Sequence, residues 1–232
     1  MLDDIIMFSE RDSSFYHEMI AHVPLYSHQN PKNVLVIGGG DGGAATEILR
    51  HGCVDAVTVV EIDPEIPTIS KKFFPDIAKG LNNKYCNLII DDGSKFIQKA
   101  EKNSYDVIIV DSTDPSPLSR SLFTSRFFKT CYELLRKDGI LVQQVGSPFY
   151  ASKSINKLHL ILSKIFKLTF LYTVYVPTYS NGFFSILLNS KNYNPVRDFD
   201  VCRFQKDGHH MRYYNADIHV ASFALPNFSK LI

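Results

Sequence analysis

The sequence lacks an excess of charge of either sign. Of its 232 residues, 25 are Lys or Arg and 24 are Asp or Glu, so the chain has no overall basic field of the kind that attracts nucleic acid. It also lacks an uninterrupted apolar run of the roughly 20 residues that a membrane-spanning helix needs. Its first residues have neither the basic start nor the apolar stretch of a secretory signal. These absences predict a protein that binds neither nucleic acid nor a membrane.

Cysteine is scarce, and no two cysteines form a C-x-x-C pair. The four cysteines are Cys53, Cys86, Cys131 and Cys202. This spacing fits reduced thiols rather than a disulfide framework or a zinc site, and so predicts a cytoplasmic protein. The histidines show no H-x-x-x-H spacing on one helix, so we expect no metal site. Near the C-terminus, His209, His210 and His219 are expected to be surface or structural residues.

The chain instead contains an alternation of strand-like and helix-like segments. Hydrophobic residues make up 45% of it, enough for one domain with its own core. Apolar runs typical of strands occupy residues 34–37, 56–60, 87–90, 106–110, 140–145, 170–176 and 183–188. Helices are expected at 44–51, 65–74, 94–100, 121–136, 154–165 and 195–204. The alternation predicts an α/β fold with a doubly wound, mostly parallel sheet.

The first 30 residues predict a short strand followed by a helix. Residues 5–8 are strand-like but have no partner strand before them, which suggests that an N-terminal piece is missing. Asp12 or Ser13 can cap the helix that follows, and Pro24 is expected to end it.

A glycine-rich loop follows the first apolar run of the alternating region. Gly38, Gly40 and Gly43 have the G-x-G-x-x-G spacing that lets a backbone approach a nucleotide closely. Glu61 ends the next strand, roughly twenty residues on, where a carboxylate can bind a ribose hydroxyl. Asp41 lies within the loop and would repel a pyrophosphate. We therefore expect a nucleoside without phosphates that is cationic near Asp41, although an ordinary strand-to-helix turn has the same spacing.

Acidic residues gather where the predicted strands end. These residues are Asp41, Glu61, Asp63, Asp91, Asp92, Asp111 and Asp114. In a doubly wound sheet, ligands bind beyond the carboxyl ends of the strands. One Asp after a strand is usually a turn former or a helix cap. Several at one edge repel one another, and a positively charged ligand would offset that repulsion.

At this point the residues resemble the spermidine synthase (polyamine aminopropyltransferase) family over essentially the whole chain. The matching stretches are Ser9-Glu-Arg-Asp12, Tyr16-His-Glu-Met19, Val36-Ile-Gly-Gly-Gly-Asp-Gly-Gly43, Val60-Glu-Ile-Asp63, Ile90-Asp-Asp-Gly93, Asp111-Ser-Thr-Asp-Pro115, Pro177-Thr-Tyr179 and Arg212-Tyr-Tyr-Asn-Ala-Asp-Ile-His219. The resemblance implies a methyltransferase-like (Rossmann-like) sheet with an antiparallel strand at its edge. It also implies decarboxylated S-adenosylmethionine as the aminopropyl donor and putrescine as the acceptor, with no other cofactor.

The resemblance implies a role for each matching site residue. Asp111 would be the proton acceptor. The diamine would be held by Asp114, Tyr16, His17 and Tyr179. The donor would be held by Gly38, Gly40, Asp41, Glu61, Asp92, Gly93 and Pro117. Without the resemblance, Tyr16 and Tyr179 read equally as core aromatics and His17 as a structural helix residue.

The chemistry of the residues agrees with these roles. A protonated primary amine has a pKa near 10 and is no nucleophile at neutral pH. A carboxylate within hydrogen-bonding distance must take its proton as the nitrogen attacks the carbon next to the sulfonium, and Asp111 is placed for this. The sulfonium is itself cationic, so an acidic crevice suits both substrates, and the reaction requires no metal.

The chain also departs from the family pattern. The resemblance implies an N-terminal β-hairpin domain, and we expect most of it to be missing from this sequence. We expect residues 1–30 to be the remainder of that strand region with its linking helix, and residues 31–232 to be the catalytic domain. Family members are usually dimers or tetramers, so a homodimer or homotetramer is expected.

Two alternatives remain open. The first is a methyltransferase that uses S-adenosylmethionine on the same scaffold; Asp41 argues against it, because the carboxylate on that donor's tail would be repelled. The second is a catalytically weak or inactive protein that binds polyamines or nucleosides.

Overall fold

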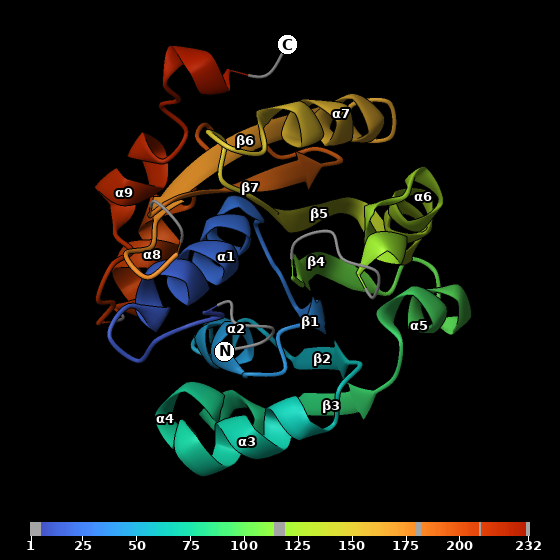
Figure 1. Ribbon diagram of the computed structural model, residues 1–232, viewed down its shortest axis with the longest axis vertical. Helices are drawn as coiled ribbons and strands as arrows, with labels where there is room; N and C mark the ends of the chain where they lie inside the picture. The colour runs from blue at the N-terminus through green and yellow to red at the C-terminus, as the bar shows by residue number, and fades with distance from the viewer. Residues whose placement is uncertain (1–5, 114–118, 180–181, 209, 231–232) are drawn as a thin grey trace.

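The fold is built on one seven-stranded sheet in the order β3-β2-β1-β4-β5-β7-β6 (Figure 1). The computed structural model describes residues 6–113, 119–179, 182–208 and 210–230. The strands are β1 (Asn33–Gly38), β2 (Ala56–Glu61), β3 (Cys86–Ile90), β4 (Tyr105–Asp111), β5 (Leu135–Gly146), β6 (Leu168–Tyr175) and β7 (Phe183–Ser190). The first five pair in parallel, and β7 runs antiparallel to both β5 and β6. The doubly wound, mostly parallel sheet is therefore confirmed, with the antiparallel strand one position inside the edge.

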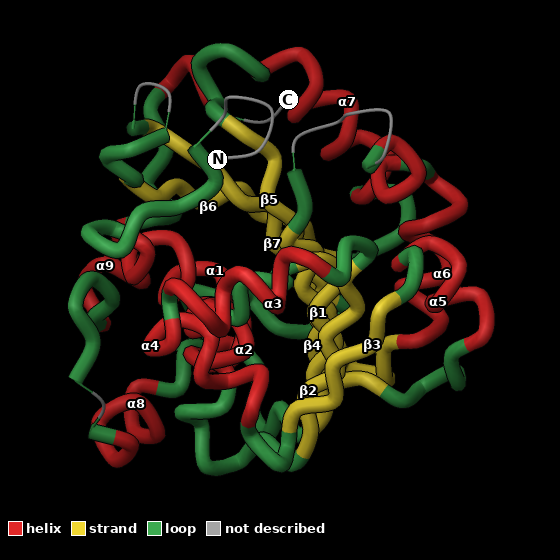
Figure 2. Tube along the Cα trace, turned by 60° about the horizontal axis from the view of Figure 1, so that its bottom comes forward, coloured by secondary structure: helices red, strands yellow, loops and turns green. Residues whose placement is uncertain are grey.

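Helices cover both faces of the sheet, as a doubly wound α/β fold requires (Figure 2). The helices are α1 (Ser13–Ser27), α2 (Gly43–Ile48), α3 (Glu65–Phe73), α4 (Pro75–Ala78), α5 (Gly93–Lys99), α6 (Ser125–Leu134), α7 (Ser152–Leu162), α8 (Val201–Asp207) and α9 (Ala216–Ala221). Short 3-10 turns lie at η1 (Lys79–Asn82), η2 (Arg120–Phe123) and η3 (Asn227–Ser229). Figure 2 shows α5, α6 and α7 on one side of the sheet and α1, α2, α8 and α9 on the other.

The alternation of side chains along the central strands divides the core in two. Val34 and Val36 of β1 pack on the face covered by α1 and α2, while Leu35 and Ile37 pack on the face covered by α5, α6 and α7. A parallel strand buried on both faces reads as a continuous apolar run, which is why β1 and β4 were predictable from sequence.

The N-terminal region differs from the prediction in two ways. Residues 6–9 form no strand. Helix α1 does not end at Pro24 but continues to Ser27. At the end of the helix, the Arg203 guanidinium donates hydrogen bonds to the carbonyl oxygens of Leu25 and His28. Helix α1 is buried from Tyr16 onward, and packing rather than propensity stabilises it.

Two other boundaries also differ from expectation. Strand β5 begins at Leu135, and the sequence Asp138-Gly139, expected to be a turn, lies within it as an irregularity opposite Asp106. Arg136 donates to the buried Asp106 carboxylate at 2.8 Å and holds this part of β5 against β4. Helix α8 begins at Val201 rather than near 195, because Asp200 caps it by accepting from the Arg203 backbone N–H.

Glu18 fastens the C-terminal segment to α1. Its buried carboxylate accepts hydrogen bonds from the backbone N–H groups of Arg212, Tyr213 and Tyr214 at 2.9, 2.8 and 2.7 Å. One side chain thus satisfies three consecutive backbone donors, and it positions the helix that carries Tyr16 and His17.

Replacing this carboxylate should destabilise the protein. We expect Glu18→Ala to lower the free energy of unfolding by about 2–4 kcal/mol, because it leaves backbone donors without an acceptor. Urea denaturation followed by circular dichroism measures the loss. Glu133→Ala is the control, since the Glu133 side chain forms an exposed ion pair with Lys102 and its loss should change stability by less than about 0.5 kcal/mol. Equal losses of unfolding free energy in both variants would show that the hydrogen bonds of Glu18 do not stabilise the fold.

Candidate active site

The site lies at the carboxyl ends of β1, β2 and β4. Strand register places Gly38 of β1 beside Asp111 of β4, and β2, which ends at Glu61, lies on the other side of β1. The loop from Gly38 to Gly43 leaves β1 between these two acids and leads into α2. Sheet topology therefore brings together carboxylates that are fifty residues apart in sequence.

Glycine is required in this loop because the backbone passes very close to the neighbouring strand ends. Gly38 has φ +82°, and a Cβ there would lie 2.1 Å from the carbonyl oxygen of Asp111. The backbone N–H of Gly39 donates to that same carbonyl at 2.9 Å. A Cβ on Gly40 would lie 2.6 Å from the Glu61 side chain. The loop backbone therefore packs directly against the Asp111 backbone and the Glu61 side chain.

Asp111 combines one bonded carboxylate oxygen with one free oxygen. The Tyr16 hydroxyl donates to Oδ1 at 2.7 Å, whereas Oδ2 is buried and has no hydrogen-bond partner among the described residues. Burial, together with the negative charge of Asp41, raises the pKa of Asp111 to about 6, despite the opposing effects of His17 and the Tyr16 hydroxyl. A buried carboxylate with a free oxygen and a raised pKa has the properties of a general base.

Asp41 and His17 form a largely buried charge pair. His17 Nε2 lies 3.4 Å from Asp41 Oδ1, which also accepts the Gly43 backbone N–H at 2.6 Å. Burial lowers the pKa of His17, but the carboxylates of Asp41, Asp111 and Glu47 outweigh it and raise the pKa to about 9. Burial likewise raises the pKa of Asp41, and His17 outweighs this and lowers it. The pair is therefore an imidazolium and a carboxylate at neutral pH.

Glu61 is fixed by backbone donors on both oxygens. Oε2 accepts the Gly40 N–H and Oε1 accepts the Asp63 N–H, each at 3.0 Å. Burial raises the pKa of Glu61. A carboxylate has about four lone-pair positions, so Glu61 can still accept from hydroxyl donors such as those of a ribose.

Asp92 and Gly93 begin helix α5 at the end of β3. Asp92 Oδ1 accepts the Ser94 backbone N–H at 2.8 Å and its hydroxyl at 2.7 Å, so Asp92 caps the helix. A Cβ on Gly93 would lie 2.4 Å from Ile37, so glycine lets α5 pack against β1. The structure thus gives both residues a local packing role, in addition to their expected contact with an adenine.

The aromatic residues expected to hold the diamine come together beside Asp111. The rings of Tyr16 and Tyr179 lie 5.9 Å apart. The Tyr179 hydroxyl donates to the carbonyl oxygen of Met7 at 2.8 Å. Tyr16 and Tyr179 are therefore neighbours in this structure, as a shared site requires.

Some expected site residues are placed differently. Asp63 and Asp91 accept hydrogen bonds from the nearby backbone N–H groups of Glu65 and Asp92, so each carboxylate also has the local role of a turn former. Asp114 and Pro117 lie outside the described residues.

Sequence reasoning missed one contact that shapes the site. Asp12 or Ser13 was expected to cap α1. Asp12 is the N-cap residue, but its side chain makes no capping hydrogen bond and instead accepts from the backbone N–H and hydroxyl of Thr178 at 2.8 Å. This clasp ties the segment that carries Tyr179 to the start of the helix that carries Tyr16. The only signal in the sequence was the presence of Asp12 and Thr178 in two motifs already singled out.

No group of three or more His, Cys, Asp or Glu able to hold a metal occurs within the described ranges. Among the helices described, none combines the length and apolar character needed to span a bilayer. His219 is a structural residue, since it is buried and bonded to the Tyr214 hydroxyl and the Pro195 carbonyl.

The parallel sheet, the glycine loop after β1 and the acid ending β2 define a nucleoside-binding α/β protein of the methyltransferase-like class. Comparison with known proteins narrows this class. The model of the spermine/spermidine synthase domain matches residues 13–200. The chain belongs to the spermine/spermidine synthase family.

Relatives and solved structures agree with this family. The chain is 43% identical to a polyamine aminopropyltransferase of Thermoanaerobacter sp. (strain X514), over 99% of this chain and 81% of the relative. It is 44% identical to one from Caldicellulosiruptor saccharolyticus, over 100% and 82%. A spermidine synthase in complex with the transition-state analogue AdoDATO superposes with a TM-score of 0.95 at 39% identity, over 98% of this chain and 78% of the other.

The contact between Gly40 and Glu61 can be tested directly. We expect Gly40→Ala to weaken the binding of methylthioadenosine at least about tenfold, since the added Cβ displaces the Glu61 carboxylate. Calorimetric titration gives the affinity. Gly52→Ala is the matched control, because a Cβ there meets no atom within 4 Å. An unchanged affinity in Gly40→Ala would remove Glu61 from the nucleoside site.

Proposed function

We propose that this protein transfers the aminopropyl group of decarboxylated S-adenosylmethionine to putrescine, giving spermidine and methylthioadenosine. Membership of the spermine/spermidine synthase family and the names of its relatives support aminopropyl transfer. The observation that carries the proposal is the unpartnered, buried Oδ2 of Asp111 next to Tyr16. It is the acceptor that an attacking amine needs.

The reaction is a direct displacement. Asp111 accepts a proton from one ammonium of the diamine, whose pKa is near 10 in water. The freed nitrogen forms a bond to the aminopropyl carbon, and the bond from that carbon to the sulfonium breaks, leaving a neutral thioether. Alignment of nitrogen, carbon and sulfur supplies much of the rate, since proximity effects reach several kcal/mol.

We propose that the donor lies along the glycine loop. Glu61 binds the ribose hydroxyls through its remaining lone pairs, and Asp92 with Gly93 contacts the adenine. Asp41 binds the ammonium of the aminopropyl group. Gly38 and Gly40 allow the donor to approach the backbone. Pro117, outside the described residues, is proposed to contact the donor as well.

The acceptor is proposed to lie on the other side of Asp111. Tyr16, His17 and Tyr179 form its wall, and Asp114, also outside the described residues, binds the far ammonium. The clasp between Asp12 and Thr178 supports this wall by holding Tyr179 near Tyr16.

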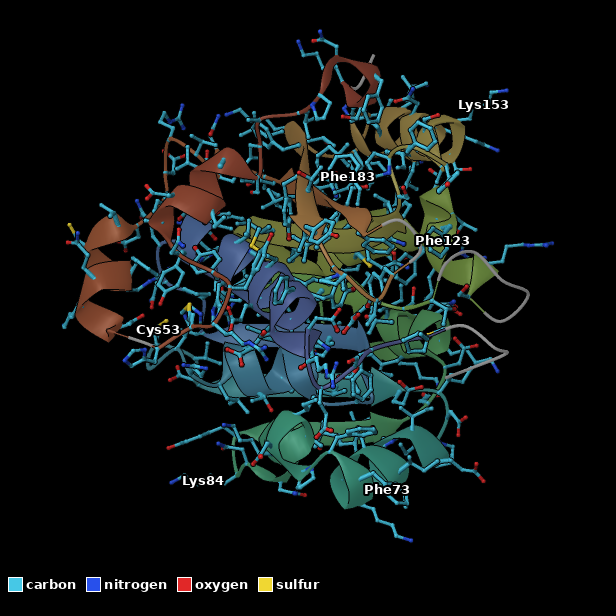
Figure 3. All side chains as sticks on the ribbon, turned by 60° about the vertical axis from the view of Figure 1, so that its left-hand side comes forward. Cys53, Phe73, Lys84, Phe123, Lys153 and Phe183 are labelled. Carbon is cyan, nitrogen blue, oxygen red and sulfur yellow. The ribbon has the colours of Figure 1, made fainter. Side chains whose placement is uncertain are left out.

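The chain organisation and the setting of the enzyme are also part of the proposal. Residues 31–232 form the catalytic domain, to which residues 1–30 contribute a linking helix, and the protein is a cytoplasmic homodimer or homotetramer. Exposed aromatic side chains support self-association. Phe149 and Phe228 are 63% and 57% exposed, and the centroids of their rings lie 6.0 Å apart. In Figure 3, Phe183, which contacts Phe228, lies far from the exposed Phe73 of α3.

A product assay tests the proposed activity. Protein incubated with labelled putrescine and decarboxylated S-adenosylmethionine should release spermidine and methylthioadenosine in equal amounts. A panel of diamines then tests the preference for putrescine. Methyl transfer from S-adenosylmethionine without spermidine formation would favour the methyltransferase alternative, and binding without any product would favour a sensor.

Asp111→Asn should abolish most of this turnover. The amide keeps a hydrogen-bond acceptor for Tyr16 but cannot take the amine proton, so we expect kcat to fall by roughly 10²–10⁴-fold with donor affinity nearly unchanged. In the wild type, kcat/KM for the diamine should fall as the pH drops toward and below 6, because Asp111, with its pKa of about 6, becomes protonated. Asp63→Asn, at a neighbouring strand end, should retain activity. A near-normal rate in Asp111→Asn would refute the assigned base.

A further inference from the structure

Asp41 already has a cationic partner in the structure described here. The His17 side chain is only 4% exposed and its Nε2 lies 3.4 Å from Asp41 Oδ1. The ring is packed directly beneath the loop, since a Cβ on Gly43 would lie 2.3 Å from its Cε1 and Nδ1. His17 therefore has little room to move away from the carboxylate.

The charged groups that face His17 come from three other elements. Asp41 approaches from the glycine loop, Asp111 from the end of β4 and Glu47 from α2. Its neighbours Phe8 and Tyr16 contribute aromatic rings, at 6.3 and 5.6 Å. Three carboxylates thus favour the imidazolium, and the described surroundings contribute no second cation to this set.

The proposed donor would bring a second cation to the same carboxylate. The primary ammonium of its aminopropyl group needs Asp41, and the sulfonium lies a few bonds away. Two cations at short range in a site shielded from water repel each other strongly. A primary ammonium holds its proton far more firmly than an imidazolium does, so the imidazolium is the group that gives way.

We propose that His17 is a proton-releasing counter-ion: it neutralises Asp41 in the empty enzyme, and donor binding discharges it to neutral imidazole, with its proton passing to solvent. The inference rests on the proposed function, because it takes the aminopropyl donor as the ligand of Asp41. It assigns to His17 a positioning and charge-balancing role beyond its proposed contact with the diamine. The diamine then enters a site that carries one positive charge fewer.

Calorimetry at pH 8.0 in buffers of different ionisation enthalpy measures the protons released per donor bound. At this pH His17, with a pKa of about 9, is roughly nine-tenths protonated, whereas Asp111, with a pKa of about 6, is almost wholly ionised. Proton release therefore reports on His17 and not on the catalytic base. We expect more than about half a proton per site with decarboxylated S-adenosylmethionine. Methylthioadenosine, which has the nucleoside but neither cation, should release almost none.

Two variants separate His17 from other groups. His17→Asn should bind the donor with proton release reduced to about a fifth or less of the wild-type value. His159→Asn, on α7 and away from the site, should release as much as the wild type. If His17→Asn fails to fold or bind, the imidazole carbon signals of isotopically labelled wild-type protein decide: donor binding should convert one histidine from cation to neutral form at pH 8.0.

The outcomes distinguish this inference from the proposed function. Tight donor binding and normal turnover without proton release would overturn the inference and leave the function intact. Equal release from the wild type and His17→Asn would also overturn it. A protein that binds methylthioadenosine but not the aminopropyl donor would overturn both.

Discussion

A carboxylate oxygen buried without a partner costs free energy, and the structure around Asp111 is arranged to hold one. Tyr16 satisfies one oxygen, and the glycine loop follows the Asp111 backbone so closely that no side chain fits at Gly38. The other oxygen remains available for a ligand. The surrounding elements position these groups. The pairing of β1 with β4 places Gly38 beside Asp111, and α1 places Tyr16 within hydrogen-bonding distance of it.

The burial of Asp111 and Asp41 in one site also requires positive charge close to them. Burial raises the pKa of Asp111, and the negative charge of Asp41 raises it further. His17 offsets part of this repulsion in the empty enzyme. Cationic substrates would offset the rest, so the acidic site favours the sulfonium and ammonium groups that aminopropyl transfer brings together.

Much of this structure could be predicted because it depends on local patterns. The apolar runs gave the five parallel strands, and the positions of Asp41, Glu61 and Asp111 after them placed these acids at one edge of the sheet. The remainder depends on contacts between distant segments. Tyr16 meets Asp111 across 95 residues, and Asp12 meets Thr178 across 166. Such contacts follow from how α1 packs across the sheet, which no local pattern encodes. The expected end of α1 at Pro24 was wrong for a related reason, since the helix is buried against the rest of the protein through Ser27.

We propose that the charge of Asp41 is what selects the donor. The most direct measurement compares the affinities of decarboxylated S-adenosylmethionine and S-adenosylmethionine, which differ only by the carboxylate on the tail. We expect the decarboxylated donor to bind at least about tenfold more tightly, because the extra carboxylate would be repelled by Asp41. Equal affinities, or a preference for S-adenosylmethionine, would contradict it.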